Sequence, residues 1–193
     1  MPISIAVRFA LRSQRRSRRR SRSVGGDDDQ VQRRYEEIAN RAEEIAIRRL
    51  RQAAQRMVNI AKSVCPVVSG RLQQSIRITR QTSHYSRVEA TVEYAKYVEF
   101  GTSRFEGRFF MRQAYRRARN LLAGTLKVSY QGESVTIRWR EIIEIRYSRI
   151  QEADPRIDLI LNPAAIDRAV NRIADTAVTD VIQRAIDNLN RRT

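Results

Sequence analysis

The residues most able to do chemistry in this sequence are arginines near its start. Residues 1–24 contain eight arginines and no acidic residue, and guanidinium groups at this density favour binding of a polyanion. Free in water such a run would repel itself, so order in it requires a counter-charge. The run could contact nucleic acid, contact an acidic protein surface or be solvated, and the sequence leaves these three alternatives open. The contact candidates in this run are Arg12, Arg15, Arg16, Arg18, Arg19, Arg20 and Arg22.

Groups that could support catalysis or metal binding are sparse. Cys65 is the only cysteine and His84 the only histidine, so an intrachain disulfide is excluded. The two could meet as nucleophile and base, but Cys65 lies in an apolar turn, where burial is the better expectation. The acidic run at 27–29 does not make a metal site, and no Gly-rich phosphate loop is present. We therefore predict no catalytic, metal or cofactor site and no enzyme activity.

The chain as a whole is strongly basic. Its 193 residues carry a formal net charge of +17, with a sequence pI near 11.3. Most of the excess lies in the first two-thirds, which would attract DNA, RNA, an anionic membrane or an acidic protein surface. No apolar run approaches the about 18 residues that a bilayer-spanning helix needs, so no membrane-spanning helix is expected, and among the candidate anionic partners we do not expect a membrane.

A long amphipathic helix is predicted from Gln30 to Lys62. Its apolar residues recur at intervals of three and four, and the aspartates at 27–29 suit a helix N-terminus. Gly25-Gly26 is expected to form a hinge before it, and Pro66 requires the helix to end first. The apolar stripe comprises Val31, Tyr35, Ile38, Ala42, Ile45, Ala46, Leu50, Ala53, Met57 and Ile60.

A turn and a hairpin are expected directly after this helix. Pro66 and Gly70 bracket the turn, and Ser69 is expected to cap a single helical turn that runs through Gln74. Strands are predicted at 76–78 and 87–92, paired antiparallel across a polar loop.

An aromatic cluster follows the second strand. The alternation over 88–93 changes to a spacing of three in Tyr94, Tyr97 and Phe100, which predicts a strand that ends in one helical or 3₁₀ turn. We expect these aromatic side chains to be largely buried in a corner of the core. Gly101 is available for a positive φ, and Glu99 is expected to accept backbone N–H groups or to pair with an arginine such as Arg71 or Arg104.

In this order and spacing, the turn at 66–76 and the aromatic cluster resemble the neck or tail-completion protein family of tailed bacteriophages. That family has a long helix, the first motif, a hairpin, the second motif and a second helix. The resemblance covers about residues 35–123. The motif positions are Pro66, Ser69, Gly70, Leu72, Ser75, Ile76, Tyr94, Ala95, Tyr97, Glu99, Phe100, Gly101 and Thr102.

The second helix is expected after Gly107 and ends at Gly124. Its opening at 108–114 lacks both prolines of the family motif. One face carries Phe110, Ala114, Ala118 and Leu121, and the opposite face carries Arg112, Arg116 and Arg119. The basic face could be solvated, contact another subunit or face a channel.

Residues 125–193 have no counterpart in the family pattern. Alternation predicts a hairpin at 125–130 and 135–140, with Trp139 as a core anchor, and a further strand at 143–147. Residues 148–161 are expected to form a long connection around Asp154-Pro155. Asn162-Pro163 then begins a second amphipathic helix that runs to about Asn190.

The predicted fold class is α+β: a long N-terminal helix packed on a small antiparallel sheet, plus an extra β-hairpin and a C-terminal amphipathic helix. We divide it into an Arg-rich arm at 1–26 with a possible short strand at 3–9, a core at 27–124 and an elaboration at 125–193.

The resemblance implies a virion structural protein at the head–tail junction, present in the host cytoplasm during assembly. It would form a homo-oligomeric ring of six or twelve subunits around the DNA channel. Its partners would be an adaptor, stopper or tail terminator, with non-specific contact to genomic DNA through the arginines above. The alternative is a basic RNA- or DNA-binding protein that uses the Arg-rich N-terminus.

Overall fold

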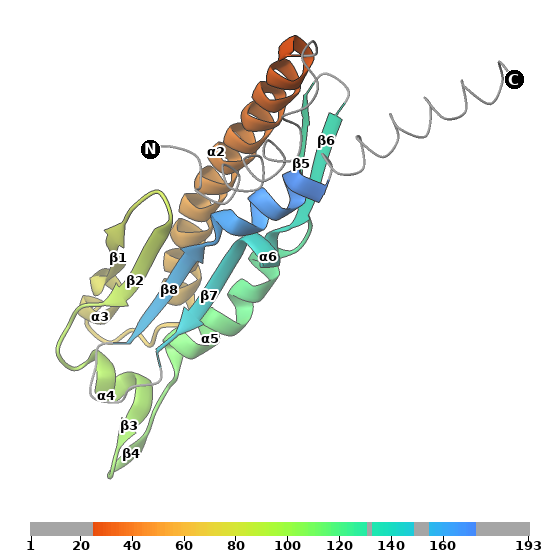
Figure 1. Ribbon diagram of the computed structural model, residues 1–193. Helices are drawn as coiled ribbons and strands as arrows, with labels where there is room; N and C mark the ends of the chain where they lie inside the picture. The colour runs from red at the N-terminus through yellow and green to blue at the C-terminus, as the bar shows by residue number, and fades with distance from the viewer. Residues whose placement is uncertain (1–24, 131–132, 149–154, 173–193) are drawn as a thin grey trace, which may run out of the picture. The chain divides into compact units, whose positions relative to one another are not determined.

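The computed structural model describes residues 25–130, 133–148 and 155–172 (Figure 1). The strand predicted at 3–9, the arginines of 12–22 and the last part of the C-terminal helix lie outside these residues. The chain separates into two compact units. Unit 1 takes residues up to 44, from 126 to 137 and from 163 onward, and unit 2 takes residues 45–125 and 138–162.

The long helix α2 (Gly25–Val64) has 40 residues and ends before Pro66, as predicted. It begins earlier than predicted because Gly25 and Gly26 are helical, so the expected hinge at these glycines is wrong. The sequence has aspartate at 27–29, and negative charge near a helix N-terminus is favourable. Its buried stripe confirms the predicted periodicity and comprises Ile38, Ala42, Ala46, Leu50, Ala53, Ala54, Met57, Val58 and Ala61.

Unit 2 is built on a four-stranded antiparallel sheet with the strand order β1-β2-β8-β7 (Figure 1). Strands β1 (Ile76–Gln81) and β2 (Tyr85–Ala90) form the predicted hairpin, with an irregularity between Ile78 and Arg80. Strand β8 (Arg156–Leu161) pairs with β2 on one side and with β7 (Ile143–Tyr147) on the other.

The central strand β8 corrects the prediction of a long connection over 148–161. Ile157, Leu159 and Leu161 are buried and alternate with half-buried side chains, which is the period of two that a strand requires. The Asp154-Pro155 pair suggested a loop, but Pro155 precedes the first strand residue, where a missing N–H is tolerated. A strand from late in the chain therefore completes the sheet that β1 and β2 begin.

One face of this sheet is apolar and covered. The helix α5 (Phe110–Ala118) contacts β7 and β8, and the ring of Tyr115 stacks on that of Tyr147 with centroids 5.9 Å apart. The buried residues on this face of β2 are Ser86, Val88 and Ala90. The opposite face carries polar and charged side chains, as antiparallel sheets with one open face commonly do.

Short elements complete unit 2. These are α3 (Arg71–Ser75), α4 (Ala95–Phe100), β3 (Gly101–Thr102), β4 (Phe105–Glu106), the 3₁₀ turn η1 (Arg119–Leu122) and α6 (Trp139–Ile142). Trp139 was expected in a strand, which is wrong because β6 ends at the preceding residue. Its core role is confirmed: it is buried, and the Arg49 guanidinium carbon lies 5.5 Å from the ring centroid.

Unit 1 contains the predicted hairpin of β5 (Thr125–Tyr130) and β6 (Glu133–Arg138), except for the end residues Thr125 and Arg138, which fall in unit 2. Leu126, Val128, Val135 and Ile137 are buried. A helix begins at residue 163, as Asn162-Pro163 predicted, and is described to residue 172. The α+β fold class is confirmed.

Candidate functional site

The aromatic segment at 94–102 forms a short helix, α4, that stops at Gly101. The Gly101 backbone has φ 84° and ψ −173°, a region that only glycine adopts readily. Strand β2, a turn and α4 follow one another in the order that the change of period predicted.

The burial prediction for the aromatic residues is wrong. Tyr94 is 38% exposed and Tyr97 49% exposed, while Ala95 and Glu99 of the same helix are fully buried. Positions four apart share a helix face, so Ala95 and Glu99 point inward together and the two tyrosines point away. Phe100 is half-buried. The inner face of α4 therefore consists of a small residue and an acid.

Glu99 joins three elements of unit 2. Its Oε2 accepts the N–H of Met111 at 2.8 Å, and its Oε1 accepts the N–H of Arg112 at 2.9 Å and the Tyr147 hydroxyl at 2.6 Å. The carboxylate thus caps the start of α5 and reaches β7. This confirms the expected backbone acceptor role, at α5 rather than at its own turn. Among the described residues, Glu99 forms no ion pair with Arg71 or Arg104.

Burial raises the pKa of Glu99 above its ordinary value, because the fully buried charge loses its water. The three hydrogen bonds and the charge of Arg112 act in the opposite direction but do not cancel this effect. Each described hydrogen bond of the Glu99 carboxyl comes from a backbone N–H or from a tyrosine hydroxyl, which fits a structural role.

Two glycines allow the backbone beyond α4 to close on itself. A Cβ on Gly101 would lie 2.6 Å from the Gly107 nitrogen and 2.7 Å from the Phe105 oxygen, and a Cβ on Gly107 would overlap the Glu99 oxygen and the Phe100 carbon. The closure is fixed by the Arg108 N–H, which donates to the Val98 oxygen at 2.7 Å. The segment between the glycines, with β3 and β4, is therefore held against α4.

The turn at 66–70 leads into α3 differently from the prediction. Gly70, not Ser69, is the N-cap of α3, and no side-chain cap bond is present there; the predicted Ser69 cap is therefore wrong. The Gly70 carbonyl instead accepts the Gln74 N–H at 2.9 Å. Leu72 and Ile76 are buried, while the Ser75 hydroxyl donates to the Leu72 oxygen at 2.7 Å.

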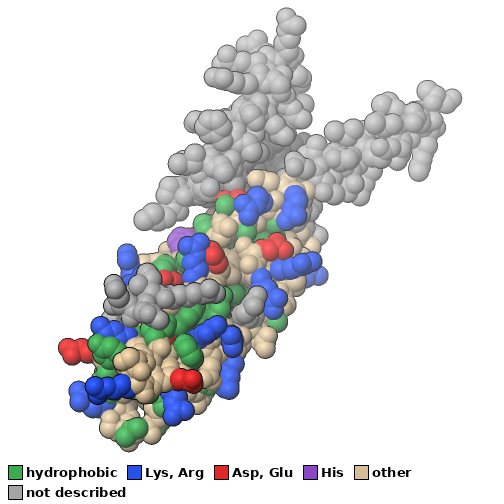
Figure 2. All heavy atoms as spheres, turned by 90° about the horizontal axis from the view of Figure 1, so that it is seen from below, with side chains coloured by type: hydrophobic (Ala, Val, Ile, Leu, Met, Phe, Trp, Pro, Cys, Tyr) green, Lys and Arg blue, Asp and Glu red, His purple; other side chains and the backbone are tan. Residues whose placement is uncertain are grey.

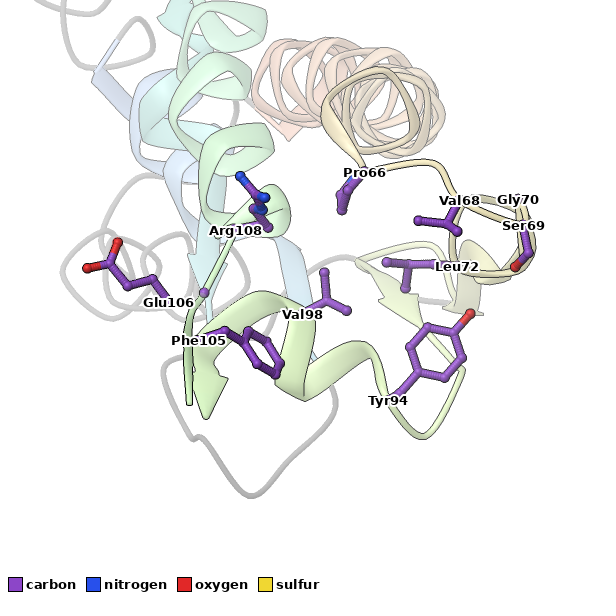
Figure 3. Close-up of a pocket in the computed structure, with 11 residues that line it drawn as sticks. Pro66, Val68, Ser69, Gly70, Leu72, Tyr94, Val98, Phe105, Glu106 and Arg108 are labelled. Atoms are coloured by element: carbon purple, nitrogen blue, oxygen red, sulfur yellow. The ribbon is translucent and has the colours of Figure 1, made fainter. Parts of the chain in front are cut away.

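An apolar hollow of about 640 Å³ lies between the turn at 66–72, helix α4 and the segment at 105–108. Figure 3 shows side chains from all three segments around it. We name this feature the apolar hollow. Its apolar lining consists of Pro66, Val68, Leu72, Tyr94, Val98 and Phe105.

The surroundings of Cys65 do not favour a nucleophilic role. Cys65 is buried, and burial together with the nearby charge of Glu99 raises the pKa of its thiol to about 11. A protonated thiol is a poor nucleophile. The Cys65 thiol donates to the Pro66 oxygen at 3.5 Å, and His84 Nδ1 lies 2.8 Å from the Ser83 hydroxyl oxygen.

Asp158 organises the polar face of the sheet. Its Oδ1 accepts the Tyr85 hydroxyl at 2.5 Å and Arg87 Nε at 2.9 Å, and Arg156 Nε lies 3.8 Å from Oδ2. The hydrogen bond from Arg87 to this carboxylate raises the pKa of the guanidinium. Asp158 thereby cross-links β2 and β8.

We expect Asp158→Ala to lower the free energy of unfolding by about 1–2 kcal/mol, since two half-buried donors, on Tyr85 and Arg87, lose their acceptor and Arg156 loses its ion pair. The matched control is Glu144→Ala. Glu144 binds Arg146 with two hydrogen bonds of 2.7 and 2.9 Å, but both side chains are more than half exposed, so no measurable change is expected. Urea unfolding followed by Trp139 fluorescence compares the two. Equal losses would show that Asp158 does not stabilise the sheet.

The arginines predicted for contact are only partly described. Arg112 and Arg116 are exposed on α5, as expected, and Arg112 lies 5.4 Å from the Phe109 ring centroid. Arg119 lies in η1, and its side chain is outside the described part. Figure 2 shows lysine and arginine side chains spread among apolar ones on the face that it draws.

In the described part of the chain, no cluster of three or more histidine, cysteine or acidic residues is placed to hold a metal ion. The helices described here include none that is long and apolar enough to cross a membrane.

The comparison with protein families bears on the same segment. Residues 29–101 match the model of one family, HK97-gp10_like, which is described as "Bacteriophage HK97-gp10, putative tail-component". This part of the chain, which is less than half of its 193 residues, is therefore similar to the HK97-gp10-like family. The match begins in α2 and ends at Gly101, so it contains the turn at 66–76 and all but Thr102 of the aromatic segment that carried the resemblance. No curated protein and no solved structure matches the chain.

The similarity to this family of putative phage tail components supports a phage structural role for the chain. The family match includes Glu99 and Gly101 but stops before their partners Met111, Tyr147 and Gly107. Sequence reasoning did not find Tyr147 as a partner of Glu99, because 48 positions separate them and no local pattern reports such a contact.

Proposed function

We propose that this protein is a virion structural protein of the head–tail neck, which forms a homo-oligomeric ring of six or twelve subunits around the DNA channel. The observation that carries the proposal is the family match over residues 29–101. The described residues fit a scaffold: the buried Glu99 accepts hydrogen bonds from α5 and β7, and burial raises the pKa of the Cys65 thiol. Adaptor, stopper or tail-terminator proteins would be its neighbours.

The net charge of +17 supports a position beside DNA. Arginines bind phosphates without reading bases, which is what a channel that passes any genome sequence requires. Arg112 and Arg116 are exposed on one helix, and the arginines of 12–22 would add to them. The same charge favours the alternative, a nucleic-acid-binding protein that acts without a ring.

Ring formation is tested with the full chain, alone and mixed with the proteins of the adjacent virion genes. Native mass measurement and negative-stain electron microscopy should show a closed ring of six or twelve copies. A protein that stays monomeric in every mixture, yet binds duplex DNA or RNA at physiological salt, would support the alternative instead.

The DNA contact is tested by Arg112→Gln with Arg116→Gln, matched by Arg51→Gln with Arg56→Gln, which removes the same charge from exposed positions on α2. Each lost phosphate contact reduces the slope of log affinity against log salt by about 0.9. We expect the α5 pair to reduce the slope by about 2 and the α2 pair to leave it unchanged. Equal slopes for both pairs would remove α5 from the DNA contact.

A further inference from the structure

The apolar hollow is surrounded by side chains that a folded protein would normally bury. Among the described residues, the exposed large hydrophobic side chains are Val67, Val68, Tyr94, Tyr97 and Phe105. Val68, Tyr94 and Phe105 line the hollow, and Val68 is as exposed as in an extended peptide, at 101%. Exposed apolar groups that gather in one place mark an interaction surface more often than isolated ones do.

The hollow is held open by the backbone that surrounds it. The Arg108 N–H bond to Val98 and the Phe109 N–H bond to the Glu99 oxygen at 3.1 Å fix the far wall. The close approach of Gly101 and Gly107 fixes the connection between that wall and α4. A hollow built in this way binds without first reorganising, which favours affinity.

The charged residues that line the hollow are Arg108 and Glu106, and further charged residues stand next to its lining residues in the sequence. Arg71, Arg104 and Arg108 are exposed, and none of them forms an ion pair with another described residue. Lys96 adds a fourth cation beside the ring of Tyr97, at 5.3 Å from its centroid. The acids of the same segments are Glu93, Glu99 and Glu106, of which Glu99 is fully buried. Cations therefore exceed acids, and an acidic partner is complementary.

A second copy of this chain fits less well. Every exposed large hydrophobic side chain of the described part lies in the loop after α2, in or beside α4, or in β4, so the described part shows no second group of such side chains for a head-to-tail contact. Two copies joined through the hollow itself would face each other with the same excess of cations, which is repulsive.

We propose that the apolar hollow binds an extended segment of a neighbouring virion protein, with large apolar side chains flanked by aspartate or glutamate. Apolar side chains of the segment would contact Val68, Tyr94 and Phe105, and its carboxylates would pair with Arg71, Arg104 or Arg108. Apolar anchors in a pocket supply affinity, and the charged rim supplies specificity. That the partner is a virion protein rests on the proposed function. Binding of an apolar and acidic segment to the hollow can be tested on the purified full chain alone.

The test uses three short fluorescein-labelled peptides and fluorescence anisotropy. In the first, leucine and phenylalanine alternate with aspartate and glutamate; in the second, lysine replaces every acid; in the third, serine replaces every apolar residue. We expect the first to bind at least about tenfold more tightly than the other two. Binding of the lysine or serine peptide at equal strength would overturn the proposal.

Paired variants locate the binding. Val68→Ser should weaken binding of the acidic peptide about tenfold, whereas Val67→Ser, the exposed neighbour that does not line the hollow, should leave it unchanged. Arg108→Gln should weaken it, and Arg117→Gln on the exposed side of α5 should not. Far-UV circular dichroism verifies that each variant is folded. Equal effects within either pair would overturn the assignment to the hollow.

Native mass measurement of the same variants separates the remaining outcomes. If Val68→Ser dissociates an oligomer of the purified protein, the hollow binds a second copy and the proposal is wrong. If a ring forms and no peptide binds, this inference falls while the neck function stands. If the acidic peptide binds with the predicted pattern to a protein that never forms a ring, the hollow is confirmed and the ring proposal falls.

Discussion

Gly107→Ala and Gly101→Ala are each expected to lower the free energy of unfolding by at least about 3 kcal/mol. At Gly107 the added Cβ would overlap the backbone of Glu99 and Phe100, and backbone atoms cannot move aside as a flexible side chain can. At Gly101 the added Cβ would meet backbone atoms at 2.6 and 2.7 Å, and the residue must also keep φ at +84°. Both substitutions force the 101–107 segment away from α4.

The control for these variants is Gly124→Ala. Gly124 also has a positive φ, +89°, but an added Cβ there would meet nothing within 4 Å. Its cost should be the left-handed backbone penalty alone, about 1–2 kcal/mol. Urea unfolding monitored by the buried Trp139 ranks the three variants. A Gly107→Ala protein as stable as Gly124→Ala would show that the segment does not close on α4 as described.

Loss of this closure should also be visible at the apolar hollow. Phe105 and Arg108 lie between or next to the two glycines, so a displaced segment opens the far wall. Under conditions in which it remains folded, the Gly101→Ala variant should therefore bind the acidic peptide weakly, although no residue that lines the hollow has changed. This links the packing of the family motif to the surface beside it.

Local periodicity was sufficient to predict part of this arrangement. Residues of α2 recur at three and four, and those of β2 alternate before the spacing changes at Tyr94, so the long helix, the hairpin and the short helix were predictable. Periodicity did not reveal which side of α4 faces inward. Hydrophobicity favoured burial of Tyr94 and Tyr97, but the small Ala95 and the acid Glu99 occupy the buried face.

The contacts between segments far apart in the sequence could not be predicted. Apolar residues occupy every second position over 156–161, which is typical of a strand, but the preceding Asp154-Pro155 favoured a loop. Nothing local indicated that this segment lies between β2 and β7 or that Tyr147 reaches Glu99. The hollow depends on three separate segments that meet in space, so it too required the structure.

Glu99→Ala is expected to lower the free energy of unfolding by about 2–5 kcal/mol. The two amide groups at the start of α5, on Met111 and Arg112, would lose their common acceptor, and an unsatisfied buried donor costs about 1–3 kcal/mol. Glu99→Gln keeps the size of the side chain and one acceptor oxygen, so its cost should be smaller. Tyr147→Phe tests the third bond: in a double-mutant cycle with Glu99→Gln, a coupling of about 1 kcal/mol is expected.

The pH dependence of Glu99 has a definite sign. Burial raises its pKa in the folded protein, whereas the unfolded chain titrates near the ordinary glutamate value of about 4.3. Between these two pKa values the folded state holds more protons than the unfolded state, so this group's contribution to stability is greatest in acid and falls as pH rises through the window. Glutamine does not titrate, so the stability of the Glu99→Gln variant has no pH-dependent contribution from residue 99.

The stability advantage of the natural protein over Glu99→Gln should therefore be larger at pH 4 than at pH 8. Urea unfolding of both proteins across this range measures the difference directly, and all other titrating groups cancel to first order. An advantage that grows with pH would mean that the hydrogen bonds from Met111, Arg112 and Tyr147 outweigh burial and hold the carboxylate charged. In that case Glu99 would cap the start of α5 as an anion, and it would stay charged over this pH range.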